Sequence, residues 1–354
     1  MRLQLTLLVA LTRTLHAEPA GEPGASAGLH VYADDDHVTV VSPSASVQSD
    51  VTSHLSVVAD ANVDAVSAAS VDVVTSASPS TVHEQRVELG VASTYRIQRA
   101  SWWTVGVRGS HEHDYDAMRL RSSIRAELAQ RNTTVEVDYV LGHDLIASMM
   151  DRSFHRERTS HELMVTASQL LNRRTVVDIV ADLAHADGYH ASPYREVLVD
   201  VPGSPLPMRL AEATPQLRRS VAVASRVRHA LTDRWTTSGT YRFYADTWSV
   251  RSHTATAEVL RSVGDRLVGW SLRGYTQGAA AFHAPRYAGS PRYRTRDRTL
   301  GAMRSLHAAV TFDIPVADWH VIASAGVLRL WFIESPLQAD RNAVLLFSSI
   351  TRAW

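Results

Sequence analysis

The residues that could do chemistry in this chain are histidines, serines and carboxylates that lie close together in the sequence. The densest group is GSHEHDYD at residues 109–116. His-x-His with carboxylates could bind a divalent metal, because imidazole suits zinc or copper and carboxylate suits calcium. In an extended strand, however, neighbouring side chains point to opposite faces, so His111 and His113 lie opposite Glu112 and Asp114. The group does not converge locally, and a solvated turn is the favoured interpretation.

A serine–histidine pair is the other arrangement that could support catalysis. Ser252 and His253 are adjacent, so in a strand they lie on opposite faces and do not pair as nucleophile and base. The chain also contains no G-x-S-x-G, P-loop, G-x-G-x-x-G or H-E-x-x-H motif. We therefore predict no enzyme activity, no cofactor and no metal site.

The elements that must position these residues are long strands. In VHEQRVELGVASTYRI, residues 82–97, odd positions carry apolar side chains such as Val87 and Leu89, and even positions carry charges such as Arg86 and Glu88. The same period of two recurs to the C-terminus in segments of about 12 residues, and helical spacing is nearly absent. This pattern predicts an all-β protein.

The connections between these segments fall into two classes. Short turns are predicted near 49–50, 98–99, 130–131, 172–173, 232–233, 264–265 and 314–315, and longer connections near 67–81, 145–156, 189–215, 281–296 and 334–341. Short turns at one end and long loops at the other are typical of a transmembrane β-barrel. We predict an antiparallel up-and-down barrel of about sixteen strands with short periplasmic turns and long extracellular loops. The proline-rich segment 189–215 is long enough to fold inward as a constriction.

A soluble β-sandwich is the alternative fold, because it also buries one face of each sheet. Soluble strands are usually about 5–6 residues long, whereas a tilted strand that crosses a membrane needs about 9–11. In a bilayer the backbone must be fully hydrogen-bonded, so the sheet has to close on itself. The apolar face then meets lipid and the charged face meets a watery lumen. A secreted sandwich would instead stay in water without detergent.

Charged side chains are predicted to line this lumen as a ladder. Arg121 and Arg125 lie one strand away from Glu136 and Asp138, where cross-strand pairing is possible. The ladder either lines a pore that selects polar solutes or forms a structural ion-pair network that braces or closes the lumen. Its predicted members are Glu84, Arg86, Glu88, Arg96, Arg108, Glu112, Arg119, Arg121, Arg125, Glu127, Glu136, Asp138, Asp178, Asp182, Arg242 and Asp246.

Aromatic residues near strand ends are predicted to lie at the two membrane–water interfaces, where such rings are enriched. They are Trp103, Tyr115, Tyr139, Trp235, Phe243, Trp270, Trp319, Trp331 and Trp354. The last strand, NAVLLFSSITRAW, is apolar and ends on an aromatic residue, which resembles the insertion signal of bacterial outer-membrane proteins. It predicts the barrel-assembly machinery as a partner, alongside outer-membrane lipid and lipopolysaccharide. The acidic turn Asp34-Asp35-Asp36-His37 could contribute to divalent-cation bridges to lipopolysaccharide.

The N-terminus predicts export. Residues 1–17 combine Arg2, a short apolar run and a small-residue cleavage site, as in a signal peptide. Residues 18–28 are predicted to be a flexible leader, and residues 29–354 the barrel of the bacterial outer membrane. The chain has no cysteine and a formal net charge of +0. It therefore has no disulfide or thiolate site, and it lacks the basic footprint of a nucleic-acid-binding protein.

Several stretches resemble an uncharacterised bacterial outer-membrane family, the domain of unknown function 3570. YRFYADTWSVRSHT at 241–254 is similar to that family's signature YRYY-x-D-x-W-x-x-x-SHT, and weaker matches occur at 63–70, 187–194 and 293–298. One departure is Ala69 with Val71, where Gly-Ala-Ser-Pro would be expected. The resemblance spans nearly the whole mature chain; it implies an outer-membrane barrel and supplies no activity.

The sequence therefore predicts a passive porin-like channel for polar solutes, or a structural barrel. The alternative from another class is a barrel-embedded lipid-modifying hydrolase. Such an enzyme would need a serine, a histidine and an acidic or amide residue that meet on the outer wall.

Overall fold

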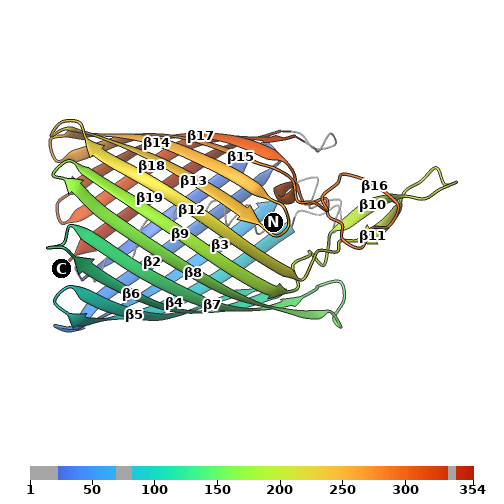
Figure 1. The fold of residues 1–354 in the computed structure, drawn as a ribbon, viewed down its shortest axis with the longest axis horizontal. Helices are drawn as coiled ribbons and strands as arrows, with labels where there is room; N and C mark the ends of the chain where they lie inside the picture. The colour runs from blue at the N-terminus through green and yellow to red at the C-terminus, as the bar shows by residue number, and fades with distance from the viewer. Residues whose placement is uncertain (1–22, 69–81, 334–339) are drawn as a thin grey trace.

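The computed structural model describes residues 23–68, 82–333 and 340–354, and these form a closed antiparallel barrel of 16 strands (Figure 1). Each strand pairs with its neighbours in the chain, and β1 pairs with β19 to close the ring. The predicted all-β barrel is confirmed. The barrel strands are β1 (Gly24–Asp34), β2 (Val38–Thr52), β3 (Leu55–Ala68), β4 (Val82–Gln98), β5 (Ser101–Glu112), β6 (Tyr115–Leu128), β7 (Thr133–Ala147), β8 (His155–Asn172), β9 (Thr175–Gly188), β12 (Leu217–Ala230), β13 (Trp235–Asp246), β14 (Arg251–Val263), β15 (Arg266–Gln277), β17 (Met303–Val316), β18 (Trp319–Phe332) and β19 (Arg341–Ala353).

The alternation of side chains has the predicted sense. On the outside, Leu89 is 61% exposed and Val327 is 62% exposed, whereas the inward carboxylates Asp138 and Asp144 are 5% and 1% exposed. A row of exposed apolar side chains around a closed sheet leaves no face for a second sheet to cover. The soluble sandwich is therefore wrong for this chain.

Three boundaries differ from their predictions. β2 continues to Thr52, whose hydroxyl accepts hydrogen bonds from the backbone N–H groups of His54 and Leu55 at 3.2 and 3.1 Å and so places the turn after residue 52. β17 likewise runs to Val316, beyond the turn predicted at 314–315. The leader predicted over 18–28 is also too long, because residues 24–28 pair with both β2 and β19. The signal peptide predicted at 1–17 lies outside the described residues.

The two ends of the barrel differ as predicted. At one end the strands are joined by the short turns at 53–54, 99–100, 129–132, 173–174, 231–234, 264–265 and 317–318. At this short-turn end the backbone N–H of Trp354 donates to the carbonyl of Pro23 at 3.0 Å. The long connections 148–154, 189–216 and 278–302 lie at the other end, the long-loop end. No helix among the described residues is long and apolar enough to cross a membrane.

The segment 189–215 does not form the inward constriction that its length suggested. It contributes β10 (Glu196–Asp200) and β11 (Met208–Ala211), which form a small sheet with β16 (Tyr287–Ala288) beyond the long-loop end (Figure 1). Val197 and Val199 share one face of β10 and are 0% and 2% exposed, so this sheet has a small core of its own. The segment therefore forms part of a separate small sheet outside the barrel.

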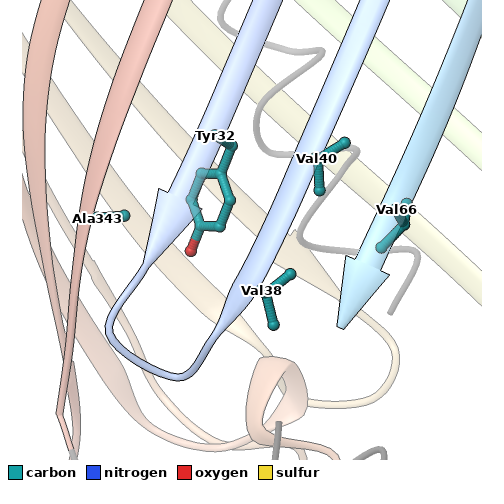
Figure 2. Packing of buried hydrophobic residues seen from close by; sticks show 5 residues of the cluster. All are labelled: Tyr32, Val38, Val40, Val66 and Ala343. Carbon is teal, nitrogen blue, oxygen red and sulfur yellow. The ribbon is translucent and has the colours of Figure 1, made fainter. Parts of the chain in front are cut away.

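The inner wall is apolar along one arc near the long-loop end. Tyr32, Val38, Val40, Val66 and Ala343 point inward from β1, β2, β3 and β19 and are all buried (Figure 2). A second buried cluster, Met303, Leu330 and Phe332, continues this surface on β17 and β18. Near the long-loop end the inner wall therefore carries an apolar patch across β17–β3, whereas charged side chains such as Asp60 and Asp64 of β3 also point inward further along these strands.

Candidate functional site

The charged side chains of the inner wall begin with a cluster on β3, β4 and β5. Arg108 bridges two carboxylates, Glu88 at 2.5 Å and Asp60 at 2.8 Å, and Arg86 binds Glu88 at 2.5 Å. A Cβ atom on the inward residue Gly90 would lie 2.7 Å from an Asp60 oxygen, so glycine leaves room for the bridge. The side chain of Glu84, the first predicted member of the ladder, lies outside the described part.

A second cluster is centred on Asp144, which sequence reasoning did not assign to the ladder. Its carboxylate accepts hydrogen bonds from Arg119 at 2.6 Å and from Arg158 Nε at 2.8 Å. Arg158 also donates to the hydroxyl of Tyr115 at 2.9 Å. Tyr115 therefore lies inside the barrel, and its predicted interfacial position is wrong. Tyr115 and Arg119 are both odd-numbered residues of β6, so the alternation of the strand puts them on the same face. The sequence alone could therefore have placed Tyr115 inward.

The cross-strand pairing predicted between β6 and β7 is present for one arginine. Arg121 Nε lies 2.6 Å from Asp138, and Arg121 Nη2 lies 3.5 Å from Glu136. Arg125 instead forms its ion pair with Glu127 of its own strand, at 3.8 Å. Most carboxylates on this part of the wall are therefore held by arginines, which is the arrangement of a structural brace.

The wall continues on β9, β12 and β13 with two more pairs. Arg226 lies 2.7 Å from Asp178, and Arg218 Nη2 lies 2.6 Å from Asp246. Arg242 points inward with its guanidinium carbon 5.6 Å from the ring centre of Tyr244. The remaining predicted members of the ladder also occupy inward positions of their strands, namely Arg96, Glu112 and Asp182.

The rim at the long-loop end contains a repeated clamp that the sequence analysis missed. Asp246 follows Tyr-Ala at the end of β13, accepts backbone hydrogen bonds from Trp248 and Val250 at 2.9 Å, and binds Arg218 from the preceding strand. Asp34 at the end of β1 does the same: it accepts from Val38 at 2.9 Å and lies 3.2 Å from Arg341.

The repeat is visible in the sequence as Tyr-Ala-Asp-x-x-x-Val at residues 32–38 and 244–250. The third residue after each aspartate, His37 and Ser249, has a positive φ of 60° and 72°. The acidic turn is therefore engaged within the chain: Asp36 binds Arg341 and Asp35 binds Asn342, so these carboxylates brace the rim.

Three polar contacts tie connections at the long-loop end together. Tyr194 donates to Asp114 at 2.5 Å, and its neighbour Arg195 lies 2.8 Å from Asp297. Arg298, the next residue after Asp297, lies 3.5 Å from Asp36 of the β1–β2 turn. We call this series of contacts the loop strap. It links four separate connections at the long-loop end.

The electrostatics of the strap favour the ionised form of Asp297. Burial acts to raise the pKa of this carboxyl, but the Arg195 guanidinium and hydrogen bonds from Thr299 act against it, and the pKa lies below its ordinary value. Nearby, burial and the charge of Arg158 lower the pKa of His190 to about 4, so this imidazole is neutral at pH 7. The Arg195–Asp297 pair therefore stays charged through the physiological range.

The predicted interfacial aromatics lie mainly at the short-turn end. Trp103, Trp270, Trp319 and Trp354 are 36–64% exposed there, and the rings of Trp235 and Trp270 stack at 6.3 Å. Trp331 lies on the outer wall at the long-loop end. Tyr139 and Phe243 also point outward, beside His161 and His253 respectively, but from within their strands.

A family model described as "Protein of unknown function (DUF3570)" matches residues 24–326. The chain belongs to this family. The resemblance found in the hairpin motif is confirmed, and DUF3570 includes nearly all of the barrel of this chain. No curated protein matches the chain in sequence.

Solved structures with a similar fold are outer-membrane barrels. The DUF3570 chain is similar to a "bacterial polysaccharide outer membrane secretin", with a TM-score of 0.54, 8% identity, and coverage of 94% of this chain and 99% of that chain. It is also similar to the ferric enterobactin receptor PfeA of Pseudomonas aeruginosa (TM-score 0.50, 9% identity, 88% of this chain and 55% of that chain). CdiB from Acinetobacter baumannii gives a TM-score of 0.51 at 8% identity, over 92% of this chain and 60% of that chain. At these identities the likeness shows the fold alone, and this chain spans little more than half of the receptor and of CdiB.

The outer wall of this DUF3570 chain gives no support to the hydrolase alternative. Ser252 and His253 lie on opposite faces of β14, 3% exposed and exposed respectively. The outward histidines bind other groups: His161 and His253 bind tyrosine hydroxyls at 2.7 Å, and His111 binds Asp116 at 2.6 Å. Among the described residues, no cluster of three His, Asp or Glu side chains could hold a metal ion.

Proposed function

We propose that this protein is a passive channel for polar solutes in the bacterial outer membrane. The observation that carries the proposal is the closed ring of 16 strands with an apolar outer face and a charged inner face. A ring of about sixteen strands is wide enough to leave an aqueous channel between its side chains. Among the described residues, the small sheet formed by the long segment 189–216 lies beyond the long-loop end and does not constrict the bore.

The same proposal assigns the paired charges a supporting role. Asp144 with Arg119 and Arg158 links neighbouring strands near the long-loop end, and Asp138 with Arg121 does so at mid-wall. Ion pairs of this kind fix side chains against the wall and so keep a bore open. The second candidate, a purely structural barrel, is favoured by the same pairs and by the loop strap, both of which bind parts of the wall to one another.

Conductance separates these two candidates. The purified full chain is inserted into planar bilayers in potassium chloride, with an unrelated detergent-purified protein as the control for leaks. A channel gives discrete, uniform single-channel steps. Properly folded barrels, identified by their heat-dependent mobility on gels, that give no steps would assign the chain to the structural candidate.

Location and partners belong to the same proposal. The apolar C-terminal strand supports insertion by the barrel-assembly machinery, and the apolar outer wall supports contact with outer-membrane lipid and lipopolysaccharide. Fractionation of cells that express the full chain tests the location. Recovery in the outer-membrane fraction is expected, and recovery in the soluble periplasmic fraction would contradict it.

A further inference from the structure

One arc of the inner wall carries arginines for which the described part of the chain provides no carboxylate partner. Arg242 on β13 and Arg273 on β15 both point into the lumen and are half-buried. Among the described residues neither of them forms an ion pair, whereas Arg86, Arg108 and Arg121 on the facing strands all do. The charge of this arc is therefore not neutralised by the wall itself.

The strand register brings these two arginines to one place. Arg242 lies opposite Thr254, and Arg273 lies opposite Thr256, two residues further along β14. The two arginines are thus one strand apart on either side of β14, offset by two residues, and both point into the lumen. On the other side of Arg273, the next strand presents His307 rather than an acidic residue. Two cations thus flank a pair of threonines whose hydroxyl groups can donate hydrogen bonds.

The nearest acidic groups are already engaged. Asp246 is held by Arg218, whose Nη2 lies 2.6 Å from the carboxylate. Glu258, two residues beyond Thr256 on β14, accepts a hydrogen bond from Ser238 at 2.6 Å and keeps its single negative charge beside the two arginines. Tyr275 shares the inward face of β15 with Arg273, lies nearer the rim, and donates its hydroxyl to Gln277. With Arg218 and Asp246 paired, the two arginines outweigh Glu258, so this arc carries a net positive charge bordered by hydrogen-bond donors.

The neighbouring strand is shaped to keep this region in place. A Cβ atom on Gly326 of β18 would lie 2.5 Å from Nε2 of His307, so only glycine there lets the imidazole lie across the wall. The imidazole is 9% exposed and occupies the side of Arg273 away from Arg242. The open side of Arg273 consequently faces Arg242 and the lumen.

From this geometry we infer that Arg242 and Arg273 form an oxyanion-binding site, so that the lumen prefers anionic solutes. The inference rests on the proposed channel function and adds its solute class. Guanidinium groups match the oxygens of carboxylate and phosphate in paired hydrogen bonds. An oxyanion between the two arginines is also attracted by both of their charges. The shared chemistry is that of an oxyanion, either an organic carboxylate or a phosphate.

The selectivity of the channel tests the inference. The full chain is placed in planar bilayers under a tenfold gradient of potassium chloride, and the reversal potential gives the ratio of anion to cation permeability. The wild-type chain is expected to prefer chloride, and R242Q/R273Q is expected to lower the ratio at least about threefold, because two charges next to the ion path are removed. Arg304→Gln removes an equal charge from the outward face of the neighbouring strand β17 and should leave the ratio unchanged. Conducting wild-type channels without anion preference, or an unchanged ratio in R242Q/R273Q, would overturn the inference.

Binding is measured separately, so that failure of the channel proposal is distinguishable from failure of the site. Thermal unfolding of the detergent-solubilised full chain is followed with potassium phosphate or potassium acetate, against potassium chloride at equal ionic strength. Tm of the wild-type chain should rise by at least about 2 °C with one of these anions, because a ligand that binds only the folded state stabilises it. R242K/R273K should keep part of the rise and R242Q/R273Q none. Equal Tm values for all three proteins in all salts would refute the site even if the chain conducts. The anion that raises Tm, acetate or phosphate, identifies whether the ligand is a carboxylate or a phosphate.

Discussion

Asp144 illustrates what single residues contribute to this wall. Its side chain is 1% exposed and binds two arginines, Arg119 and Arg158, that come from the strands on either side. Removing one partner from such a buried group of charges costs more than the pair gains by forming, because the remaining charges stay desolvated. Gly142, two residues earlier, makes the arrangement possible, since a Cβ there would lie 2.9 Å from Arg119 Nε.

At this scale we expect Asp144→Asn to lower the free energy of unfolding by about 3 kcal/mol, because two arginines lose their shared anion. Unfolding in urea, followed by tryptophan fluorescence in detergent, measures the change. Asp233→Asn is the matched control, since Asp233 is 99% exposed and its ion pair with Arg174 is 3.9 Å long. Equal losses of stability in both variants would show that the charge cluster has no special role.

The face of the wall on which a residue lies was predictable wherever the period-two alternation of its strand determines it. The inward side of Arg108, Arg121 and Asp178 follows from period-two alternation, which is a local property of a strand. The ion-pair partners of these residues were harder to predict, because they depend on the register between strands. Asp144 pairs with β8 through a register that the sequence of its own strand does not reveal. Arg273 was not predicted as a site residue for the same reason, since its surroundings are formed by β13, β14, β15 and β17 together.

At the scale of elements, the long loops form a structure of their own instead of closing the barrel. The loop strap joins them through Arg195 and Asp297, and the small sheet buries Val197 and Val199. The alternation in Glu196–Asp200 is only five residues long, so the sequence alone did not distinguish it from a loop. The rim clamps at 32–38 and 244–250 were detectable as a repeat, but their meaning required the arginine that each one binds from the adjacent strand.

The strap should respond to acid with a defined sign. The pKa of Asp297 lies below its ordinary 3.8 in the folded chain. Because the folded pKa is depressed, the stabilisation is present above about pH 4 and is lost as pH falls below that value. Amide hydrogen exchange in 194–212 and 294–300, corrected for intrinsic rates, should show protection that declines across this window.

Two variants separate the strap from a general effect of acid. Asp297→Asn should show weak protection already at pH 4 and little further change down to pH 2. Asp200→Asn, which alters an exposed carboxylate of the same small sheet that binds Arg286, should follow the wild-type curve. A wild-type curve that stays flat, or one that Asp297→Asn reproduces, would contradict the role of this carboxylate.

At the scale of the whole molecule, one physical requirement explains the long strands, the closed ring and the distribution of charge. A sheet in hydrocarbon must satisfy every backbone group, and closure of β1 on β19 does so. The outer wall can then be apolar throughout its middle, and the charges have only the lumen to occupy. This part of the fold was predictable because strand length and alternation can be read from the local sequence. The apolar patch across β17–β3 was not, because Tyr32 of β1 and Ala343 of β19 come together only when the ring closes.

The orientation of side chains in a bilayer is therefore the most direct test of this account. The chain has no cysteine, so single spin labels can be introduced at successive positions 86–91 of β4 after substitution such as Glu88→Cys or Leu89→Cys. In reconstituted bilayers, the labels at 87, 89 and 91 should be relaxed mainly by oxygen dissolved in lipid, and those at 86, 88 and 90 mainly by a water-soluble nickel reagent. Accessibility without this alternation, or with the two sets exchanged, would contradict the lipid-facing outer wall and the aqueous lumen.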